Sequence, residues 1–289
     1  MTIVLRTVEA LNEALRDARG KEIGLVPTMG FLHEGHLSLM RQARKENELV
    51  FVSIFVNPTQ FGPNEDLDRY PRDPEGDLAK CQSVGVDFIW MPDVDTVYPP
   101  DHSTTVHVEG LTSGLCGAAR PGHFDGVTTV VTKLLNRIGP DRAYFGAKDF
   151  QQLAVIRRMA RDLDMRTEII GMPIVRDADG LALSSRNKYL SAADRQDGLL
   201  LSAALEAARQ QWHAGTRSED ALRAAMQDVL RAGANTRVDY IEIVDRDTLL
   251  PLRDAPSEQP VAALAVFVGN TRLIDNARLD QPHAVRSTP

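Results

Sequence analysis

The sequence predicts an α/β protein in which a doubly wound parallel sheet is followed by a smaller α+β domain. Two observations support this fold class. Short apolar runs alternate with stretches of helical spacing, and such runs are typical of parallel strands that are buried on both faces. After residue 176 the order changes to two helices followed by two strands. We therefore expect a first domain over 1–175 and a smaller C-terminal domain over 176–289.

The elements of the first domain follow in order along the chain. An amphipathic helix over 8–19 ends at Gly20. Pro27 and Gly30 break the apolar run 23–26, and apolar side chains then recur at helical spacing from His33 on. Further strands are expected at 49–56, 87–90, 142–145 and 168–175, and further helices at 74–84, 126–137 and from 150 through 163. The stretch 93–125, rich in Pro and Gly, carries one more candidate strand at 104–108.

The C-terminal domain is expected to begin with helices over 192–213 and 219–232, the second of them capped by Ser218. Strands follow at 239–244 and 261–268. We expect the chain to fray after Asn276.

Composition and charge narrow the classes of function. The 289 residues are 43% hydrophobic and 25% charged, as in ordinary globular proteins, and the net charge of −7 argues against a general binder of nucleic acid or membrane surfaces. Cys81 and Cys116 lack C-x-x-C spacing, so we expect reduced thiols rather than a disulfide framework or a zinc site. Neither a signal peptide nor a membrane span is expected. These features indicate a cytoplasmic enzyme or binding protein.

Three polar loops follow predicted strands, at 33–36, 57–60 and 146–149. Ligands of parallel sheets bind at the carboxyl ends of strands. His33 and His36 would share a face of the first helical turn, beside free N–H groups and the positive end of the helix dipole. Two imidazoles there could hold the phosphates of a nucleotide and stabilise charge during attack on an α-phosphorus. The alternative is a strand-to-helix turn with two surface histidines.

Other polar side chains suit the same chemistry. Lys148 could reach a phosphate, and Asp149 could bind a ribose hydroxyl, although a surface lysine and a helix cap are the plainer interpretations. Ser184, Ser185 and Arg186 suit triphosphate oxygens, or form only a capped loop; no G-x-S-x-G elbow marks a serine nucleophile.

Gln60 and Gln152 can each donate and accept hydrogen bonds, which suits a small hydroxylated substrate, although either could be plain surface. Neither a Walker A motif nor G-x-G-x-x-G is present. Two aspartate pairs could contact magnesium, although turns favour aspartate as well: Asp93 with Asp95, and Asp177 with Asp179.

The loops resemble the motifs of the pantoate–β-alanine ligase family. The resemblance runs in the same order over residues 3–276 and lies in VPTMGFLHEGH (26–36), SIFVNPTQF (53–61), RYPR (69–72), RPGHF (120–124), FGAKDFQQ (145–152), DGLALSSRN (179–187) and LIDN (273–276). One departure is Ala147, where the family usually has Glu. The resemblance implies a Rossmann-like domain of the cytidylyltransferase type, a C-terminal domain that closes over the active site, and a homodimer. It implies that ATP and (R)-pantoate form pantoyl adenylate and pyrophosphate, and that β-alanine then gives pantothenate and AMP.

The resemblance also implies roles for individual residues. His36 is the family's catalytic histidine, and the other catalytic candidates are His33, Lys148, Ser184, Ser185 and Arg186. ATP is expected along Met29, Gly30, Phe31, Leu32, His33, Glu34, Gly35, His36, Gly146, Ala147, Lys148, Asp149, Val175, Leu183, Ser184, Ser185 and Arg186. Pantoate is expected at Pro27, Thr28, Met29, Asn57, Gln60 and Gln152, with Gln60 also near β-alanine. Mg²⁺ should accompany the triphosphate, and no protein ligand is assigned to it.

Two rival functions stay open on the sequence alone. One is a related enzyme that transfers AMP to a phosphate or an amino acid, and the other is a catalytically silent nucleotide sensor. The net negative charge argues against an enzyme that charges tRNA. Gln60 and Gln152 argue against an acceptor substrate that is a phosphate. All the catalytic candidates are present, which speaks against a silent sensor. An assay with ATP, pantoate and β-alanine that follows AMP separates the three.

Overall fold

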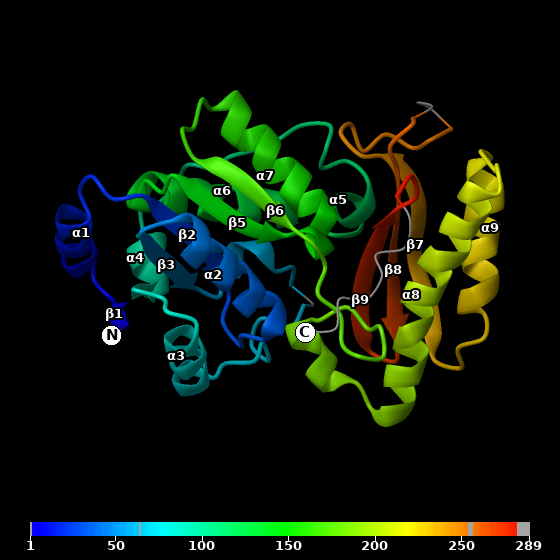
Figure 1. The fold of residues 1–289 in the computed structure, drawn as a ribbon, viewed down its shortest axis with the longest axis horizontal. Helices are drawn as coiled ribbons and strands as arrows, with labels where there is room; N and C mark the ends of the chain where they lie inside the picture. The colour runs from blue at the N-terminus through cyan, green and yellow to red at the C-terminus, as the bar shows by residue number, and fades with distance from the viewer. Residues whose placement is uncertain (1, 64, 254–256, 282–289) are drawn as a thin grey trace. The chain divides into compact units, whose positions relative to one another are not determined.

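The computed structural model describes residues 2–63, 65–253 and 257–281, which form two compact units (Figure 1). The first unit contains the chain up to Thr112, together with Arg120–Ala147 and Gln152–Val175. The second contains Ser113–Ala119, Lys148–Gln151 and the chain from Arg176 on. The sequence places 113–119 and 148–151 in the first domain, whereas they pack with the second unit, where Cys116 contacts Tyr240 and Asn276 donates to the carbonyl of Lys148.

Within the described residues, the first unit is built on a six-stranded parallel sheet in the order β1-β4-β3-β2-β5-β6. The strands are β1 (Ile3–Leu5), β2 (Ile23–Thr28), β3 (Leu49–Ile54), β4 (Phe88–Trp90), β5 (Arg142–Gly146) and β6 (Glu168–Met172). The sequence missed β1, which is too short to stand out as an apolar run. The strand order reverses between β2 and β5, and such a switch point is where parallel sheets bind ligands.

Helices surround this sheet and connect its strands (Figure 1). In the first unit they are α1 (Val8–Asp17), α2 (Glu34–Glu46), η1 (Pro58–Gln60), α3 (Pro74–Ser83), α4 (Val94–Val97), α6 (His123–Ile138) and α7 (Phe150–Asp162) from Gln152 on. The turn η2 (Ala147–Asp149) precedes α7, and the residues 148–151 belong to the second unit. Buried apolar side chains such as Met40, Val52 and Ile89 fill the space between helices and sheet. No helix in the described part of the chain is long and apolar enough to cross a membrane.

The prediction of a strand at 104–108 is wrong, because this segment pairs with no strand in the part of the chain that the structure describes. The threonine side chains of α6 take up its backbone groups instead. Val106 N–H donates to Thr129 Oγ1 at 2.9 Å, and the Val106 carbonyl accepts from Thr128 Oγ1 at 2.5 Å. Hydrogen bonds to a helix therefore replace the ladder of a sheet.

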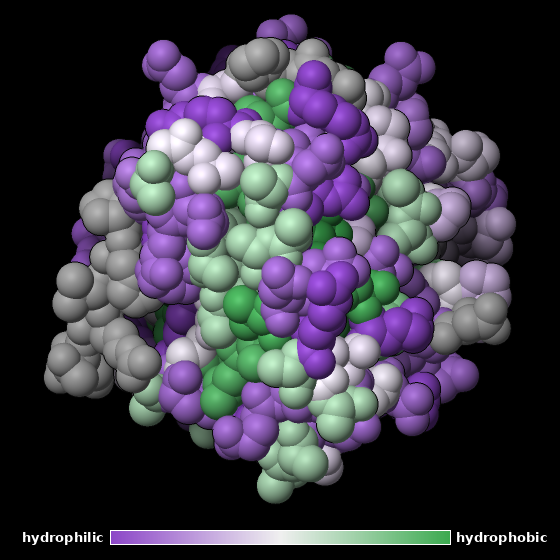
Figure 2. Space-filling view, turned by 90° about the vertical axis from the view of Figure 1, so that its right-hand side faces the viewer, coloured by the Kyte–Doolittle hydropathy of each residue, from purple (hydrophilic) through white to green (hydrophobic). Residues whose placement is uncertain are grey.

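The second unit packs α8 (Ala192–His213) and α9 (Glu219–Leu230) on an antiparallel sheet of β7 (Thr236–Asp245), β8 (Pro260–Val268) and β9 (Thr271–Arg278), and also carries α5 (Leu115–Ala119) and η3 (Ser185–Tyr189). Its core includes Leu205, Leu222, Met226 and Leu264. Figure 2 shows the side on which Figure 1 draws α9, where hydrophobic residues gather in patches between hydrophilic ones.

The sequence missed β9, which extends through the point where we expected fraying to begin. Asp275 and Asn276 interrupt its apolar pattern, but both are buried and hydrogen bonded, since Arg176 pairs with Asp275 at 2.6 Å. Residues 282–289 lie outside the described part of the chain.

Candidate active site

The predicted residues divide between the two units. The first unit holds residues 27–36, Asn57, Gln60, Gly146, Ala147, Gln152 and Val175, and the second holds Lys148, Asp149 and residues 183–186.

The two histidines of the H-x-x-H turn cap helix α2 with their own side chains. His33 is the N-cap residue, and its Nδ1 accepts from Gly35 N–H at 3.2 Å. The Nδ1 atom of His36 accepts from His33 N–H at 3.3 Å, which completes a capping box. The ring centroids lie 4.1 Å apart. Because each Nδ1 accepts a hydrogen bond, the ring proton lies on Nε2, from which each imidazole can donate to a ligand.

This arrangement leaves fewer backbone N–H donors at the turn than the sequence interpretation assumed. The sequence interpretation relied on free backbone N–H groups at the start of α2. In the structure, the N–H groups of His36 and Leu37 donate to the His33 carbonyl at 2.8 and 3.1 Å, and those of His33 and Gly35 are bound by the imidazoles. The imidazole Nε2 atoms are therefore further donors that this turn can offer to a phosphate.

Asp77 of α3 holds the loop that leads to this turn, and the sequence analysis missed it. Its carboxylate accepts from the N–H groups of Phe31 and Leu32 at 2.8 and 2.7 Å, and the side chain is buried at 1% exposure. Gly30 lies at φ +80°, a conformation that favours glycine, and a Cβ there would lie 2.9 Å from Asp77 Oδ2. Both the backbone conformation and the lack of space therefore require glycine at this position. Burial raises the pKa of Asp77, although the two N–H bonds oppose that shift. A carboxylate on the buried face of α3, next to Cys81, was the available signal.

A second cluster joins β2 to the turn η1. Asn57 is 1% exposed, and its Nδ2 donates to Gln60 Oε1 at 3.1 Å and to the Gly126 carbonyl at 3.0 Å. Gln60 Nε2 in turn donates to Met29 Sδ at 3.2 Å. Tyr98 donates to Asn57 Oδ1 at 2.9 Å. The structure therefore brings Met29, Asn57 and Gln60 together, and adds Tyr98, which no motif indicated.

The other predicted residues of the first unit lie at or after the ends of strands β2, β5 and β6. Thr28, at the end of β2, donates through its hydroxyl to the Ser53 carbonyl at 2.8 Å and accepts from Gly30 N–H. Gly146 ends β5, and Ala147 begins η2. Gln152 is half-buried in the first turn of α7, and Val175 is half-buried beyond β6.

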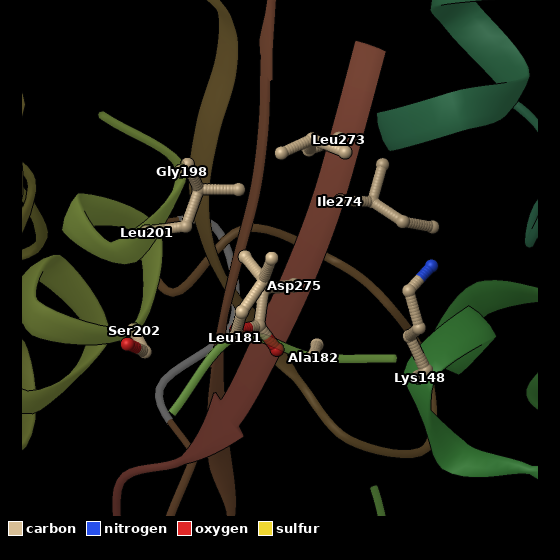
Figure 3. A pocket seen from close by; sticks show the side chains of 9 residues that line it. All are labelled: Lys148, Leu181, Ala182, Gly198, Leu201, Ser202, Leu273, Ile274 and Asp275. Atoms are coloured by element: carbon tan, nitrogen blue, oxygen red, sulfur yellow. The ribbon is translucent and has the colours of Figure 1, made fainter. Parts of the chain in front are cut away.

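In the second unit, Lys148 lies beside the LIDN segment of β9. Asn276 Nδ2 donates to the Lys148 carbonyl at 2.9 Å. The lysine side chain lines a pocket with Leu181, Ala182 and Ile274, and Figure 3 shows its nitrogen near Ile274. Asp149 is exposed. These contacts fix the main chain at 148 and leave a cationic side chain at a largely apolar wall.

The serine-rich loop begins η3. Ser184 is its N-cap, with Oγ accepting from Arg186 N–H at 3.3 Å, so the plainer interpretation of this residue as a cap holds. Ser185 is buried, whereas Leu183 and Arg186 are half-buried. Capping does not prevent the Ser184 hydroxyl from donating to a ligand, because an oxygen that accepts a hydrogen bond keeps its proton.

The acidic residues that the structure describes gather in no metal-binding cluster. Among the described residues, no group of three or more His, Cys, Asp or Glu side chains could hold a metal ion. Asp177 and Asp179 both pair with Arg195, at 2.6 and 2.8 Å.

Comparisons with known proteins agree over the length of the chain. The family model for pantoate-beta-alanine ligase matches residues 3–278. Pantothenate synthetase from Moorella thermoacetica is 55% identical over 279 residues, which cover 96% of this chain and 98% of that protein. Pantothenate synthetase from Thermus thermophilus is 48% identical, with a TM-score of 0.91 and coverage of 96% of this chain and 99% of that one. Pantoate-beta-alanine ligase from Francisella tularensis, solved with beta-gamma ATP and beta-alanine, is 31% identical, with a TM-score of 0.81 and coverage of 98% and 99%.

Proposed function

The chain belongs to the pantoate–β-alanine ligase family, and from this premise we propose which of its residues carry out each half of the reaction. The reaction is the ATP-dependent condensation of pantoate with β-alanine. An amine cannot displace oxide from a free carboxylate at a useful rate, so the carboxylate must first be activated. The candidate residues His33, His36, Lys148 and Arg186 are donors that suit phosphorus chemistry, and we propose activation by adenylation rather than an acyl-enzyme.

In the first half-reaction, the carboxylate oxygen of (R)-pantoate bonds to the α-phosphorus of ATP, and the bond from that phosphorus to pyrophosphate breaks. His36 and His33 donate from Nε2 to the phosphate oxygens, where negative charge grows in the transition state. The observation that carries this assignment is the capping box, which fixes both rings and keeps each proton on Nε2. Glu34 and Gly35 complete the first turn of α2 between them.

The second unit contributes charged and hydroxyl donors. We propose that Lys148, Ser184, Ser185 and Arg186 bind the triphosphate, and that the C-terminal domain closes over the site as the family resemblance implies. We propose that Asp149 binds a ribose hydroxyl of ATP. Mg²⁺ is treated as part of the MgATP substrate, since the described side chains form no carboxylate cluster for it.

In the second half-reaction, the amine of β-alanine bonds to the acyl carbon of pantoyl adenylate, loses a proton, and expels AMP. We propose that Gln60 and Gln152 hold pantoate, with Gln60 also near β-alanine. Support comes from the contacts that join Gln60 to Asn57 and Met29 at the end of β2. A homodimer and a cytoplasmic location are proposed from the family resemblance, and sedimentation velocity and cell fractionation test them.

Substitution of the two glutamines tests the substrate assignment. Gln60→Ala and Gln152→Ala should each raise the KM for pantoate by roughly 3- to 10-fold, because each removes a hydrogen bond to the substrate, and should leave the KM for ATP nearly unchanged. Gln82→Ala, on the exposed face of α3, is the matched control and should change neither constant. If the KM for ATP rises instead, the nucleotide and pantoate subsites are reversed.

A further inference from the structure

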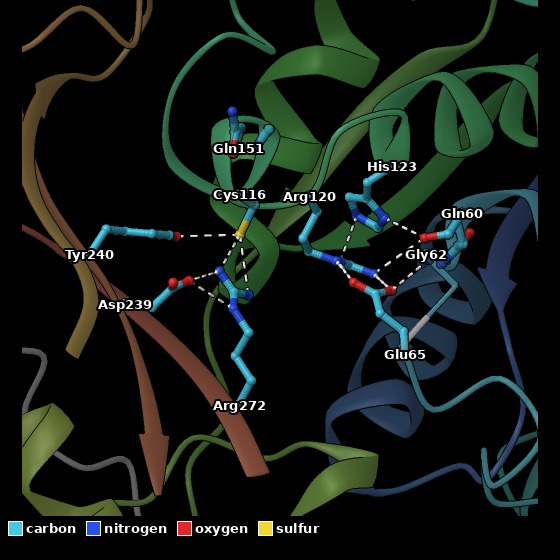
Figure 4. A network of polar contacts seen from close by, with 11 residues as sticks. Gln60, Gly62, Glu65, Cys116, Arg120, His123, Gln151, Asp239, Tyr240 and Arg272 are labelled. Carbon is cyan, nitrogen blue, oxygen red and sulfur yellow. Dashed lines mark hydrogen bonds and ion pairs between the residues drawn. The ribbon is translucent and has the colours of Figure 1, made fainter. Parts of the chain in front are cut away.

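The RPGHF motif, residues 120–124, has no role in the mechanism above, yet two of its side chains converge on one main-chain atom of Gln60. His123 Nδ1 lies 2.8 Å from the Gln60 carbonyl oxygen, and Arg120 Nη2 donates to the same oxygen at 3.2 Å (Figure 4). All of these residues belong to the first unit. The carbonyl of Gln60 is thus bound from two sides by residues about 60 positions away in the chain.

Glu65 holds Arg120 in place. The guanidinium donates through Nε to Glu65 Oε1 and through Nη2 to Oε2, both at 2.6 Å, in a bidentate pair whose side chains are only 17% and 27% exposed. Glu65 Oε2 also accepts from Gly62 N–H at 3.2 Å, just after η1. Burial would raise the pKa of Glu65, but the hydrogen bonds and charge of Arg120 outweigh it and lower the pKa below its ordinary value. The pair therefore stays charged and fixed at neutral pH.

The contacts of His123 define its tautomer. A carbonyl can only accept, so Nδ1 must carry the proton that is donated to Gln60. Nε2 then has a lone pair, and it accepts from Arg120 Nη1 at 3.0 Å. Both ring nitrogens are engaged, which orients the ring in one way only.

Helix α6 packs in direct contact with η1, the turn that carries Gln60. A Cβ on Gly126 would lie 2.5 Å from the Thr59 carbonyl oxygen and 2.6 Å from Gln60 N, so only glycine allows this approach. Asn57 adds its hydrogen bond to the Gly126 carbonyl. The main chain of η1 is therefore held by α6 at one side and by Arg120 and His123 at its carbonyl.

We infer that Glu65, Arg120 and His123 are positioning residues that fix the main chain of Gln60, so that its side-chain amide is presented to pantoate in one orientation. The inference rests on the proposed role of Gln60 in pantoate binding. None of the three residues needs to touch the substrate, because they act through the Gln60 carbonyl. Pre-organisation of this kind lowers the entropy lost when the substrate binds.

The test is a double-mutant cycle between His123 and Gln60. His123→Leu removes the donor to the carbonyl and should raise the KM for pantoate by roughly 3- to 10-fold, as expected for a lost hydrogen bond, with the KM for ATP unchanged. His123→Asn places an N–H near the position of Nδ1 and should restore most of the wild-type value. In a Gln60→Ala background, His123→Leu should add less than about twofold, because residues that act as a unit are not additive.

Two further variants complete the experiment. His107→Leu is the matched control, since His107 also contacts α6, through Asp125, but is exposed; it should leave both constants unchanged. If His123→Leu does not fold, Glu65→Gln serves in its place, because it keeps the shape of the side chain but removes its charge. It should raise the KM for pantoate in the wild-type background and not in the Gln60→Ala background.

The outcomes separate the inference from the function on which it rests. If Gln60→Ala leaves the KM for pantoate unchanged, the proposed role of Gln60 is wrong and the inference fails with it. If Gln60→Ala raises that KM but His123→Leu and Glu65→Gln do not, only the inference fails. Equal effects of His123→Leu in both backgrounds, or a parallel rise in the KM for ATP, would also overturn it.

Discussion

The pair His33 and His36 performs a structural and a chemical task with different atoms of the same rings. Nδ1 of each ring replaces a missing hydrogen-bond partner at the start of α2, and Nε2 carries the proton proposed for the α-phosphate. A ring with two distinct nitrogens can meet both demands, because one nitrogen accepts while the other donates.

Two substitutions at His36 should separate these tasks. His36→Asn keeps an acceptor near the Nδ1 position but removes the Nε2 donor, whereas His36→Ala removes both. We expect both variants to slow pyrophosphate release about 10²- to 10³-fold, as for loss of a donor to a charged transition state. Only His36→Ala should also lower the free energy of unfolding, by about 1 kcal/mol for the lost cap.

Single-turnover kinetics and urea unfolding measure the two effects. His213→Ala, an exposed histidine at the end of α8, is the control. An unchanged kcat with weaker ATP binding in His36→Asn would mean that this ring only binds the nucleotide.

At the scale of elements, helix α3 fixes the loop between β2 and α2. The carboxylate of Asp77 accepts from two main-chain N–H groups of that loop, and Gly30 makes room for it. The position of the histidine turn thus depends on a residue more than 40 positions away.

Replacing Asp77 with Asn should loosen this loop. An amide has one acceptor oxygen, whereas the carboxylate has two. One of the two main-chain N–H groups therefore loses its acceptor and faces the NH₂ group of the asparagine instead. We expect a loss of about 1–3 kcal/mol in the free energy of unfolding, and slower adenylate formation because the turn that follows moves. Urea titration and pyrophosphate release report the two changes, with Asp68→Asn on the exposed surface as the control. Wild-type stability would show that the loop does not need this carboxylate.

The sequence predicted most elements because their apolar spacing is local. Helices α8 and α1 begin where expected, and Ser218 caps α9 through its side chain. The errors occur where contacts with residues far away in the chain determine the secondary structure. The segment 104–108 binds threonines of α6 instead of a neighbouring strand. Strand β9 continues past Asn276 because Arg176 and Lys148 supply partners for its polar residues.

The candidate site shows the same limit at the scale of the whole molecule. Loops at strand ends could be predicted from their position after apolar runs, and the order of the strands puts β2 and β5 at the switch point of the sheet. Asp77 and the cluster of Glu65, Arg120 and His123 could not be assigned, because their roles depend on contacts between segments far apart in the chain. The spacing of H-x-x-H indicated a shared face but could not show which ring nitrogen caps the helix.

The exchange of pyrophosphate into ATP tests the adenylate mechanism most directly. The whole protein, given MgATP, (R)-pantoate and labelled pyrophosphate but no β-alanine, should incorporate label into ATP, because adenylation is reversible and complete before the amine binds. Omission of pantoate should abolish the exchange, and AMP should be released only after β-alanine is added. Exchange that requires β-alanine, or the appearance of ADP and phosphate in place of AMP and pyrophosphate, would contradict the adenylate and, with it, the assignment of His33 and His36 to the α-phosphate.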